Sequence, residues 1–172
     1  EILKEMCEMD PGDETPPGGS ALDRESIRRR LQPLNPLVEG YLSLETQLQP
    51  NGFDLSLSSI AVFANLATAS GVLTTEDSAR RLAKTAPLEF GIDGSIHLDP
   101  GCYLTSFNEV VNIPLDLMAL GRPRSSLLRS GVALHTAVWD AGYKGRSQAL
   151  LVVYHPHGFT LSHNARLMQL VF

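Results

Sequence analysis

The chain has 172 residues, of which 43% are hydrophobic and 19% charged, so it fits one ordinary globular domain with a hydrophobic core, not a disordered or fibrous chain. No apolar run approaches the roughly 20 residues that cross a bilayer, and the acidic start does not resemble a signal peptide, so we expect a cytoplasmic protein that does not enter a membrane. A formal net charge of -5 disfavours nucleic acid as a partner, whereas a local cluster of arginines favours a small anion.

The chain begins with a polar segment. Residues 10–20 are rich in proline and glycine, a composition that limits core burial and is typical of a mobile linker. We expect residues 1–20 to be a flexible N-terminal segment or the remnant of a fused peptide, and residues 21–172 to form the folded domain. Cys7 and Cys102 lie far apart, and we expect both to be free thiols.

Two short helices are predicted. The first begins at Asp23, which caps it, presents Ile27 and Leu31 at helical spacing, and stops at Pro33. The second runs over residues 75–84, because acidic residues in its first turn and basic residues in its last match the helix dipole.

The remaining regular structure is predicted to be short strands punctuated by glycine, proline and asparagine. The predicted strands cover residues 53–63, 95–98, 103–108, 110–113, 132–137, 149–154, 159–161 and 166–172. Many short strands, few helices and no βαβ alternation predict a mainly β fold, that is, a sandwich, jelly roll or barrel.

Two segments present side chains suited to a nucleotide. Residues 121–131, GRPRSSLLRSG, carry three arginines and two adjacent serines, and forked guanidinium donors suit phosphate oxygens. Residues 139–145, WDAGYKG, place a carboxylate three residues before an aromatic ring, with a glycine between them. The alternatives are a solvated basic turn for the first segment and a plain β-turn for the second. Trp139 is expected in the core or at a subunit contact.

Two further segments carry isolated polar residues in apolar strands. Asp54 falls where the alternating pattern calls for burial, so it needs a partner or a metal-bound water. Arg166 and Gln169 are three residues apart on one strand, and regular alternation sends them to opposite faces. By that argument, one of the two at most faces a shared site.

Taken in this order, the four segments resemble the dUTPase and dCTP deaminase superfamily over the chain from about Gln49 to its end, most closely the archaeal-type dUTPases. The resemblance implies a dUTPase-like jelly roll, a distorted barrel or β-clip with one or two short helices. It also implies dUTP as the substrate, Mg²⁺ as the cofactor, and a homotrimer with active sites between its subunits.

The resemblance assigns roles to individual residues. Asp140 orients the water that attacks the α-phosphorus, Gln169 helps to position that water, and Asp54 holds waters around magnesium. Tyr143 packs on the deoxyribose and excludes ribose. The implied phosphate-binding residues are Arg124, Ser125, Ser126 and Arg129, and His135 is a candidate for the uracil pocket.

One position separates the two activities of the superfamily. Deaminases of this kind carry a glutamate five residues after the glycine of the hairpin, and that position is Leu150 here. No Glu follows Glu109 and no Asp follows Asp140, while Gln148 cannot take up a proton. We therefore predict a dUTP diphosphatase. The alternatives are a dCTP deaminase, a bifunctional deaminase and dUTPase, a catalytically silent nucleotide-binding regulatory protein, or a cupin-like metal enzyme.

Overall fold

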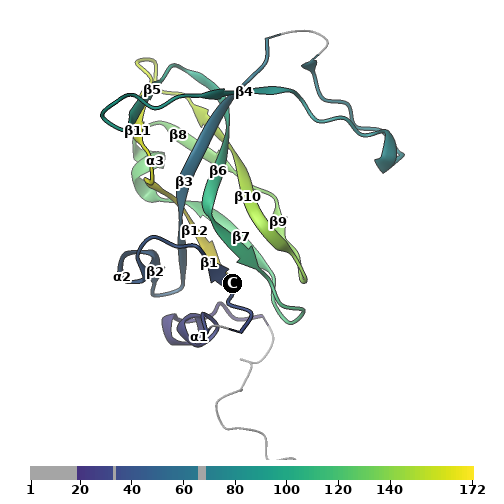
Figure 1. Ribbon diagram of the computed structural model, residues 1–172, viewed down its shortest axis with the longest axis vertical. Coiled ribbons are helices and arrows are strands. Elements are labelled where there is room, and N and C mark those ends of the chain that lie inside the picture. The colour runs from purple at the N-terminus through teal and green to yellow at the C-terminus, as the bar shows by residue number, and fades with distance from the viewer. Residues whose placement is uncertain (1–18, 33, 66–68) are drawn as a thin grey trace, which may run out of the picture.

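A computed structural model of the protein describes residues 19–32, 34–65 and 69–172 (Figure 1). The helices are α1 (Arg24–Arg29), α2 (Leu44–Gln47), α3 (Ser125–Arg129) and the 3₁₀ helix η2 (Asp77–Ala79). The strands are β1 (Val38–Glu39), β2 (Leu48–Gln49), β3 (Gly52–Phe63), β4 (Thr85–Leu88), β5 (Ser95–Leu98), β6 (Gly101–Asn112), β7 (Ala119–Pro123), β8 (Val132–His135), β9 (Val138–Trp139), β10 (Lys144–Val153), β11 (Phe159–Ser162) and β12 (Arg166–Val171).

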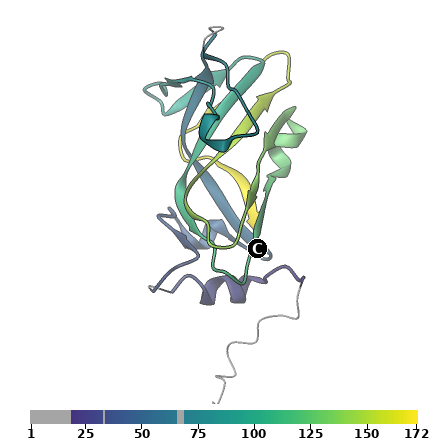
Figure 2. The same cartoon turned by 90° about the vertical axis from the view of Figure 1, so that its right-hand side faces the viewer.

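Most of these strands form one curled antiparallel sheet in the order β8-β10-β6-β3-β12-β7-β9, with β1, β2 and β4 added at its margins. A separate pair, β5 and β11, completes the β structure of the described chain. The sheet wraps around its own apolar interior, and α1 lies across one end of it (Figure 2). The predicted mainly β, jelly-roll-like fold with few short helices is confirmed.

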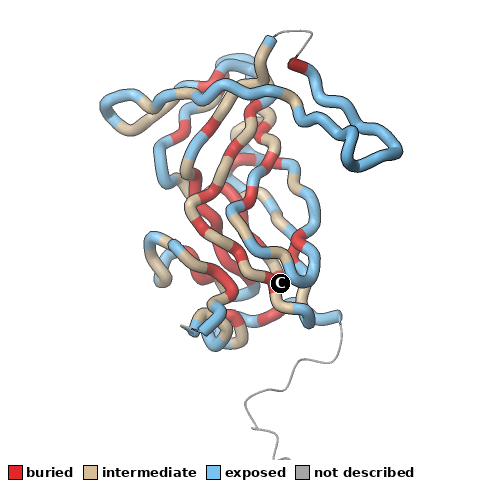
Figure 3. The backbone as a smooth tube through the Cα atoms, turned by 45° about the vertical axis from the view of Figure 1, so that its right-hand side comes forward, coloured by how far each residue is buried: buried red, intermediate tan, exposed pale blue. Residues whose placement is uncertain are grey.

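The core lies inside the curl of the long strands (Figure 3). Buried residues alternate with partly exposed ones along β6, which is the pattern of a strand with one face in the core. Phe53, Phe107, Leu151 and Leu170 are fully buried and come from β3, β6, β10 and β12. Residues 103–108 and 110–113 were predicted as two strands, but residues 101–112 form the single strand β6, and Ile113 follows its end.

The first predicted helix is confirmed as α1. The side chain of Asp23 accepts a hydrogen bond from the backbone N–H of Ser26 at 2.8 Å, and Ile27 is fully buried. The backbone N–H of Leu22 donates to the carbonyl of Phe172 at 2.9 Å, so the start of the folded chain is fastened beside the end of β12. Pro33 and residues 1–18, including Cys7, lie outside the described residues, and Cys102 is a free, exposed thiol.

The second predicted helix, over residues 75–84, is wrong. The chain there forms an extended arm, in which Val72 and Arg81 pair as an isolated antiparallel bridge and η2 supplies one short turn. Every residue from 71 to 82 is exposed, and Figure 3 shows the arm projecting from the sheet. A ten-residue helix with no apolar face to bury does not recover the cost of its nucleation, although its charges match the dipole.

Candidate functional site

Asp54 is the centre of the first group of polar residues. It lies on β3 with 2% of its surface exposed, and its Oδ2 atom is 3.1 Å from Nη1 of Arg166 and 3.4 Å from Nε of Arg124. Burial raises the pKa of the Asp54 carboxyl above its ordinary value of 3.8, and the two guanidinium groups oppose that rise. The expectation that a buried Asp54 needs a partner is confirmed, and the partners are arginines.

Each arginine is held at Asp54 by the backbone around it. Arg124 precedes α3 in an extended conformation, and its N–H donates to the carbonyl of Leu167 at 2.9 Å. Arg166 begins β12, and its guanidinium also donates to the carbonyl of Thr46. The two side chains remain about one third exposed, so both can reach a ligand from solvent.

The prediction that Arg166 and Gln169 face opposite ways is wrong. Arg166 pairs with Ser56 and Gln169 pairs with Asp54, and these two partners lie two residues apart on β3, hence on one face. The register between β12 and β3 shifts just after Arg166, and the two residues between Arg166 and Gln169 are both buried. This bulge adds one residue to the alternation and brings both polar side chains to the face of Asp54.

Gly52 leaves room for the Gln169 side chain. A Cβ atom at Gly52 would lie 2.7 Å from Nε2 of Gln169 and 2.5 Å from the carbonyl oxygen of Leu170. No other residue type fits there without displacing β12.

Behind Asp54 lies a buried hydrogen-bond network that sequence reasoning missed. Nε2 of Gln47 donates to the carbonyl of Asp54 at 2.9 Å and to Oε1 of Glu109 at 2.6 Å. The fully buried Glu109 carboxylate also accepts from the N–H and the hydroxyl of Ser56, at 2.9 and 2.6 Å. The available sequence signal was Glu109, an acid at a core-facing position of an alternating strand. A carboxylate buried there needs hydrogen-bond donors from the protein interior.

The predicted phosphate-binding residues lie on and beside α3. Ser125 and Ser126 form its first turn and are exposed, Arg129 ends it and is also exposed, and buried Leu127 fastens the helix to the core. Arg124 therefore joins the turn of α3 to the group around Asp54, because its backbone begins this turn while its side chain reaches Asp54.

The second group of polar residues lies on the tight turn between β9 and β10, which we call the hairpin, although β9 pairs with β7 and β10 pairs with β6 and β8. The N–H of Tyr143 donates to the carbonyl of Asp140 at 3.0 Å, and Gly142 has a φ of 83°, which closes the turn. Trp139 is buried, as expected, and its Nε1 donates to Oγ of Ser147 at 2.6 Å. Asp140 is exposed at the tip and Tyr143 is half-buried.

A pocket of about 120 Å³, the hairpin pocket, opens within this hairpin. It is lined by Ala137, Val138, Trp139, Tyr143, Ser147 and Gln148. His135 does not line it, but borders a separate cavity of about 370 Å³ together with Arg122 and Tyr154. Leu150, at the position of the deaminase glutamate, is half-buried and pairs with Leu104 on β6 and His135 on β8.

The two groups lie apart within one chain. Trp139 pairs with Ala119 on β7, whereas Arg122, three residues further along β7, pairs with Gln169. Arg122 and Gln169 therefore form a row across the two strands. At about 3.3 Å per residue, the hairpin begins roughly 10 Å along the sheet from this row. Among the described residues, no hydrogen bond or ion pair joins Asp140 to the group around Asp54.

The described part of the chain has neither a metal-binding cluster nor a membrane-spanning helix. No three His, Cys, Asp or Glu side chains gather there as a group that could hold a metal ion, His155 and His157 included. No helix there is long and apolar enough to cross a membrane.

Comparison with known proteins identifies the family. Residues 21–172 match the family model described as dCTP deaminase-like. The chain belongs to the dCTP deaminase-like family. Among solved structures, the 2'-deoxycytidine 5'-triphosphate deaminase from Agrobacterium tumefaciens superposes on 88% of this chain with a TM-score of 0.63 and 21% identity, so the two share a fold. This member of the family covers 46% of that longer chain.

Curated archaeal proteins are more similar in sequence to this family member. A Methanosarcina mazei protein named probable deoxyuridine 5'-triphosphate nucleotidohydrolase is 48% identical over 151 residues, which cover 88% of this chain and 86% of the relative. An Archaeoglobus fulgidus protein of the same name is 42% identical over 153 residues, with coverage of 89% and 87%. The predicted resemblance to the dUTPase and dCTP deaminase superfamily is confirmed.

Proposed function

We propose that the protein is a dUTP diphosphatase, which hydrolyses dUTP to dUMP and pyrophosphate. Relatives that carry this name are 42% and 48% identical over most of both chains. The observation that decides between the two activities of the family is Leu150, because a half-buried apolar side chain occupies the position where deamination needs a proton shuttle.

The proposed reaction needs positioning and charge stabilisation more than covalent chemistry. Asp140 accepts a hydrogen bond from the attacking water and takes its proton as the oxygen bonds to the α-phosphorus. Gln169 holds that water. The bond from the α-phosphorus to the bridging oxygen breaks, and pyrophosphate leaves with the electron pair.

Arg124 and the first turn of α3 supply the proposed phosphate contacts. The Arg124 guanidinium and the hydroxyls of Ser125 and Ser126 are adjacent donors on one exposed turn, and Arg129 ends the same helix. At the hairpin pocket, the Tyr143 ring packs against the sugar and excludes a ribose hydroxyl.

Mg²⁺ fits this donor set as the counter-ion of the triphosphate. In nucleotide sites this ion keeps several waters and is held by one or two carboxylates together with substrate phosphates. Asp54 would act on it only through water, because its carboxylate is 2% exposed and already paired with Arg124 and Arg166. When bound, the ion would neutralise charge on the phosphates.

We also infer a homotrimer with its active sites between subunits. The supporting observation is the separation, within one chain, of the hairpin that carries Asp140 from the row that carries Gln169. An oligomer can bring the hairpin of one subunit to the row of the next.

The test is to offer the protein dUTP, dCTP and dTTP with Mg²⁺ and to measure pyrophosphate and ammonia. We expect pyrophosphate from dUTP and no ammonia from dCTP. Asp140→Asn should lower the rate about 100- to 10,000-fold, the usual contribution of a general base. Asp99→Asn, at an exposed acid far from the hairpin in sequence, is the matched control and should retain activity. Ammonia release from dCTP by the unaltered protein would contradict the proposal.

A further inference from the structure

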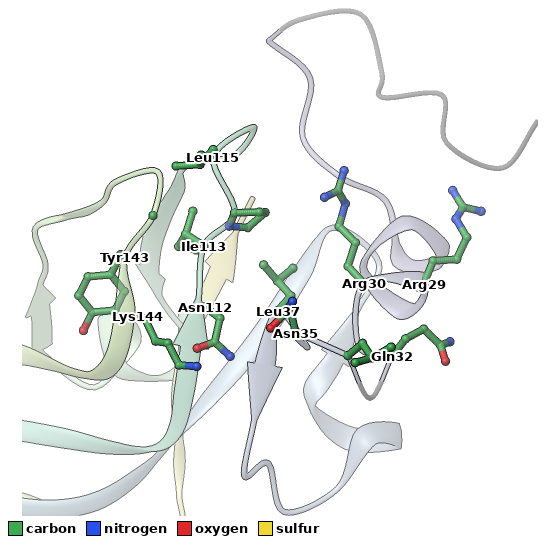
Figure 4. Close-up of a pocket in the computed structure, with 13 residues that line it drawn as sticks. Arg29, Arg30, Gln32, Asn35, Leu37, Asn112, Ile113, Leu115, Tyr143 and Lys144 are labelled. Carbon is green, nitrogen blue, oxygen red and sulfur yellow. The ribbon is translucent and has the colours of Figure 1, made fainter. Parts of the chain in front are cut away.

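A third cavity, larger than the two already described, also borders the hairpin. We call it the basal cavity; it measures about 540 Å³ and lies between the segment that follows α1 and the hairpin (Figure 4). Arg30, Leu37, Ile113, Leu115, Tyr143 and Lys144 are among its lining residues. This volume is within the range of pockets that take small organic molecules, about 300 to 1,000 Å³.

The lining combines an apolar wall with positive charge. Leu37, Ile113 and Leu115 supply apolar surface, and Arg29, Arg30 and Lys144 are the cations of the lining. Arg30 is paired with Asp116 at 2.9 Å, whereas Arg29 makes no ion pair in the described chain. None of the described residues that line the cavity is acidic, and Lys144 makes no ion pair in the described chain. In a protein with a net charge of -5, this cavity is a local basic site.

One amide in the wall has spare hydrogen-bonding capacity. Nδ2 of Asn112 donates to the carbonyl of Pro36 at 2.7 Å and to Oε1 of Glu39 at 2.6 Å, whereas its buried Oδ1 has no partner in the described structure. A buried acceptor of this kind is stabilised by a donor.

The wall of the basal cavity is hydrogen-bonded to the catalytic hairpin. The N–H of Ile113 donates to the carbonyl of Tyr143 at 2.8 Å, and the carbonyl of Ile113 accepts from Gly142 at 2.9 Å. Tyr143 in turn donates its N–H to the carbonyl of Asp140 at 3.0 Å. Tyr143 also lines both the basal cavity and the hairpin pocket, so one side chain borders the two sites.

We propose that the basal cavity binds a small organic anion with an apolar body, and that its occupancy alters the hairpin that carries Asp140 and Tyr143. The anionic group is attracted by Lys144 and Arg29, and the apolar body packs on Ile113 and Leu115. The binding site stands on the cavity alone, whereas the effect on the hairpin rests on the proposed hydrolysis of dUTP.

Binding is tested without any nucleotide by titrating the full chain with anilinonaphthalene sulfonate, a fluorescent apolar anion. We expect a saturable rise in fluorescence, with the Kd raised about fivefold by Lys144→Gln, the loss expected for one partly exposed charge contact. Leu115→Ser should weaken binding by a similar factor of about five, the value of a partly buried apolar contact.

Matched controls lie on the arm. Lys84→Gln and Leu73→Ser change an equally exposed lysine and leucine, and should leave the Kd unchanged. Arg124→Ala, in the proposed phosphate site, should also leave it unchanged. A Kd that is unchanged by both cavity substitutions, or that rises with Arg124→Ala, would place the dye elsewhere and overturn the proposal.

The effect on the hairpin is read from hydrolysis of dUTP at zero and saturating dye. We expect a shift in KM for dUTP that disappears in Leu115→Ser, whose own basal KM and kcat are unchanged. An identical KM with and without dye would overturn the coupling. If the protein released no pyrophosphate from any nucleotide, the proposed function would fail, while the dye titration would still decide the binding site.

Discussion

Asp54 is placed where function and stability oppose each other. Its carboxylate is almost fully buried on β3, and burial raises its pKa despite Arg124 and Arg166 at 3.4 and 3.1 Å. A raised pKa means that the charged form is less favourable in the folded protein than in the unfolded chain. The fold therefore keeps a charge at this position at a cost, which is the pattern of a residue retained for its chemistry.

Replacing Asp54 with asparagine should raise stability and lower activity. In the window above the ordinary pKa of 3.8 and up to the raised one, the folded state holds more protons than the unfolded state, so stability falls as pH rises through it. Asparagine does not titrate, so Asp54→Asn does not lose stability as the pH rises. The two arginines released from Asp54 are solvated, because both are about one third exposed. Urea unfolding at fixed protein concentration should show the variant at least as stable at pH 7, with no advantage near pH 4.

The same variant should hydrolyse dUTP about 10- to 100-fold more slowly, as for other groups that act through metal-bound water. A variant that is less stable than the unaltered protein at pH 7 would show that the arginine pairing outweighs the burial of the charge.

At the scale of elements, the junction of β3 and β12 sets the geometry around Gln169. The bulge after Arg166 turns two polar side chains to one face, and Gly52 provides the space into which the Gln169 amide packs. Gly52→Ala should therefore destabilise the protein by about 1 to 3 kcal/mol, the usual cost of an inserted methyl group in a packed site, and should lower kcat.

Gly101→Ala is the control for that substitution, because a Cβ at Gly101 meets its nearest neighbour, the Tyr103 ring, at an ordinary 3.7 Å. Thermal unfolding and initial rates on dUTP measure both variants. Equal effects of the two substitutions would mean that the close approach of Gly52 to β12 has no special role.

The sequence predicts those elements in which local pattern and tertiary packing agree. The Asp23 cap of α1 is predicted correctly, because it depends on residues close in the chain. The strand character of β6 is also predicted, although the prediction divides this strand in two. The helix over residues 75–84 fails because its charge pattern is helical while nothing packs against it. Strands of two residues, such as β1 and β9, exist through their partners and have no signal of their own.

The sequence likewise predicts some features of the site and misses others. The segments around Arg124, Asp140 and Gln169 are contiguous motifs, so they are recognisable in the chain. The bulge in β12 and the hydrogen bonds of Glu109 join residues more than fifty positions apart in sequence, as with Ser56. Such contacts depend on strand register, which the sequence of one strand does not encode.

For the whole molecule, the separation of the two groups of site residues makes a quantitative prediction. Arg124→Ala should disable the α3 side of the site, and Asp140→Asn the hairpin side. If each active site takes its hairpin from one subunit and its α3 from the next, neither variant alone hydrolyses dUTP, but a mixed oligomer contains sites in which both parts are intact.

Unfolding the two variants together at equal concentrations and refolding them should restore activity. Random assembly gives a probability of one half for each intact part, so about one quarter of the sites are complete and about one quarter of the unaltered activity returns. Each variant refolded separately is the control, and size-exclusion chromatography checks that the oligomer has re-formed. A mixture with no more activity than the separate variants, in an oligomer of the same size, would show that each active site is built within one subunit, and that the hairpin moves to Arg124 within its own chain.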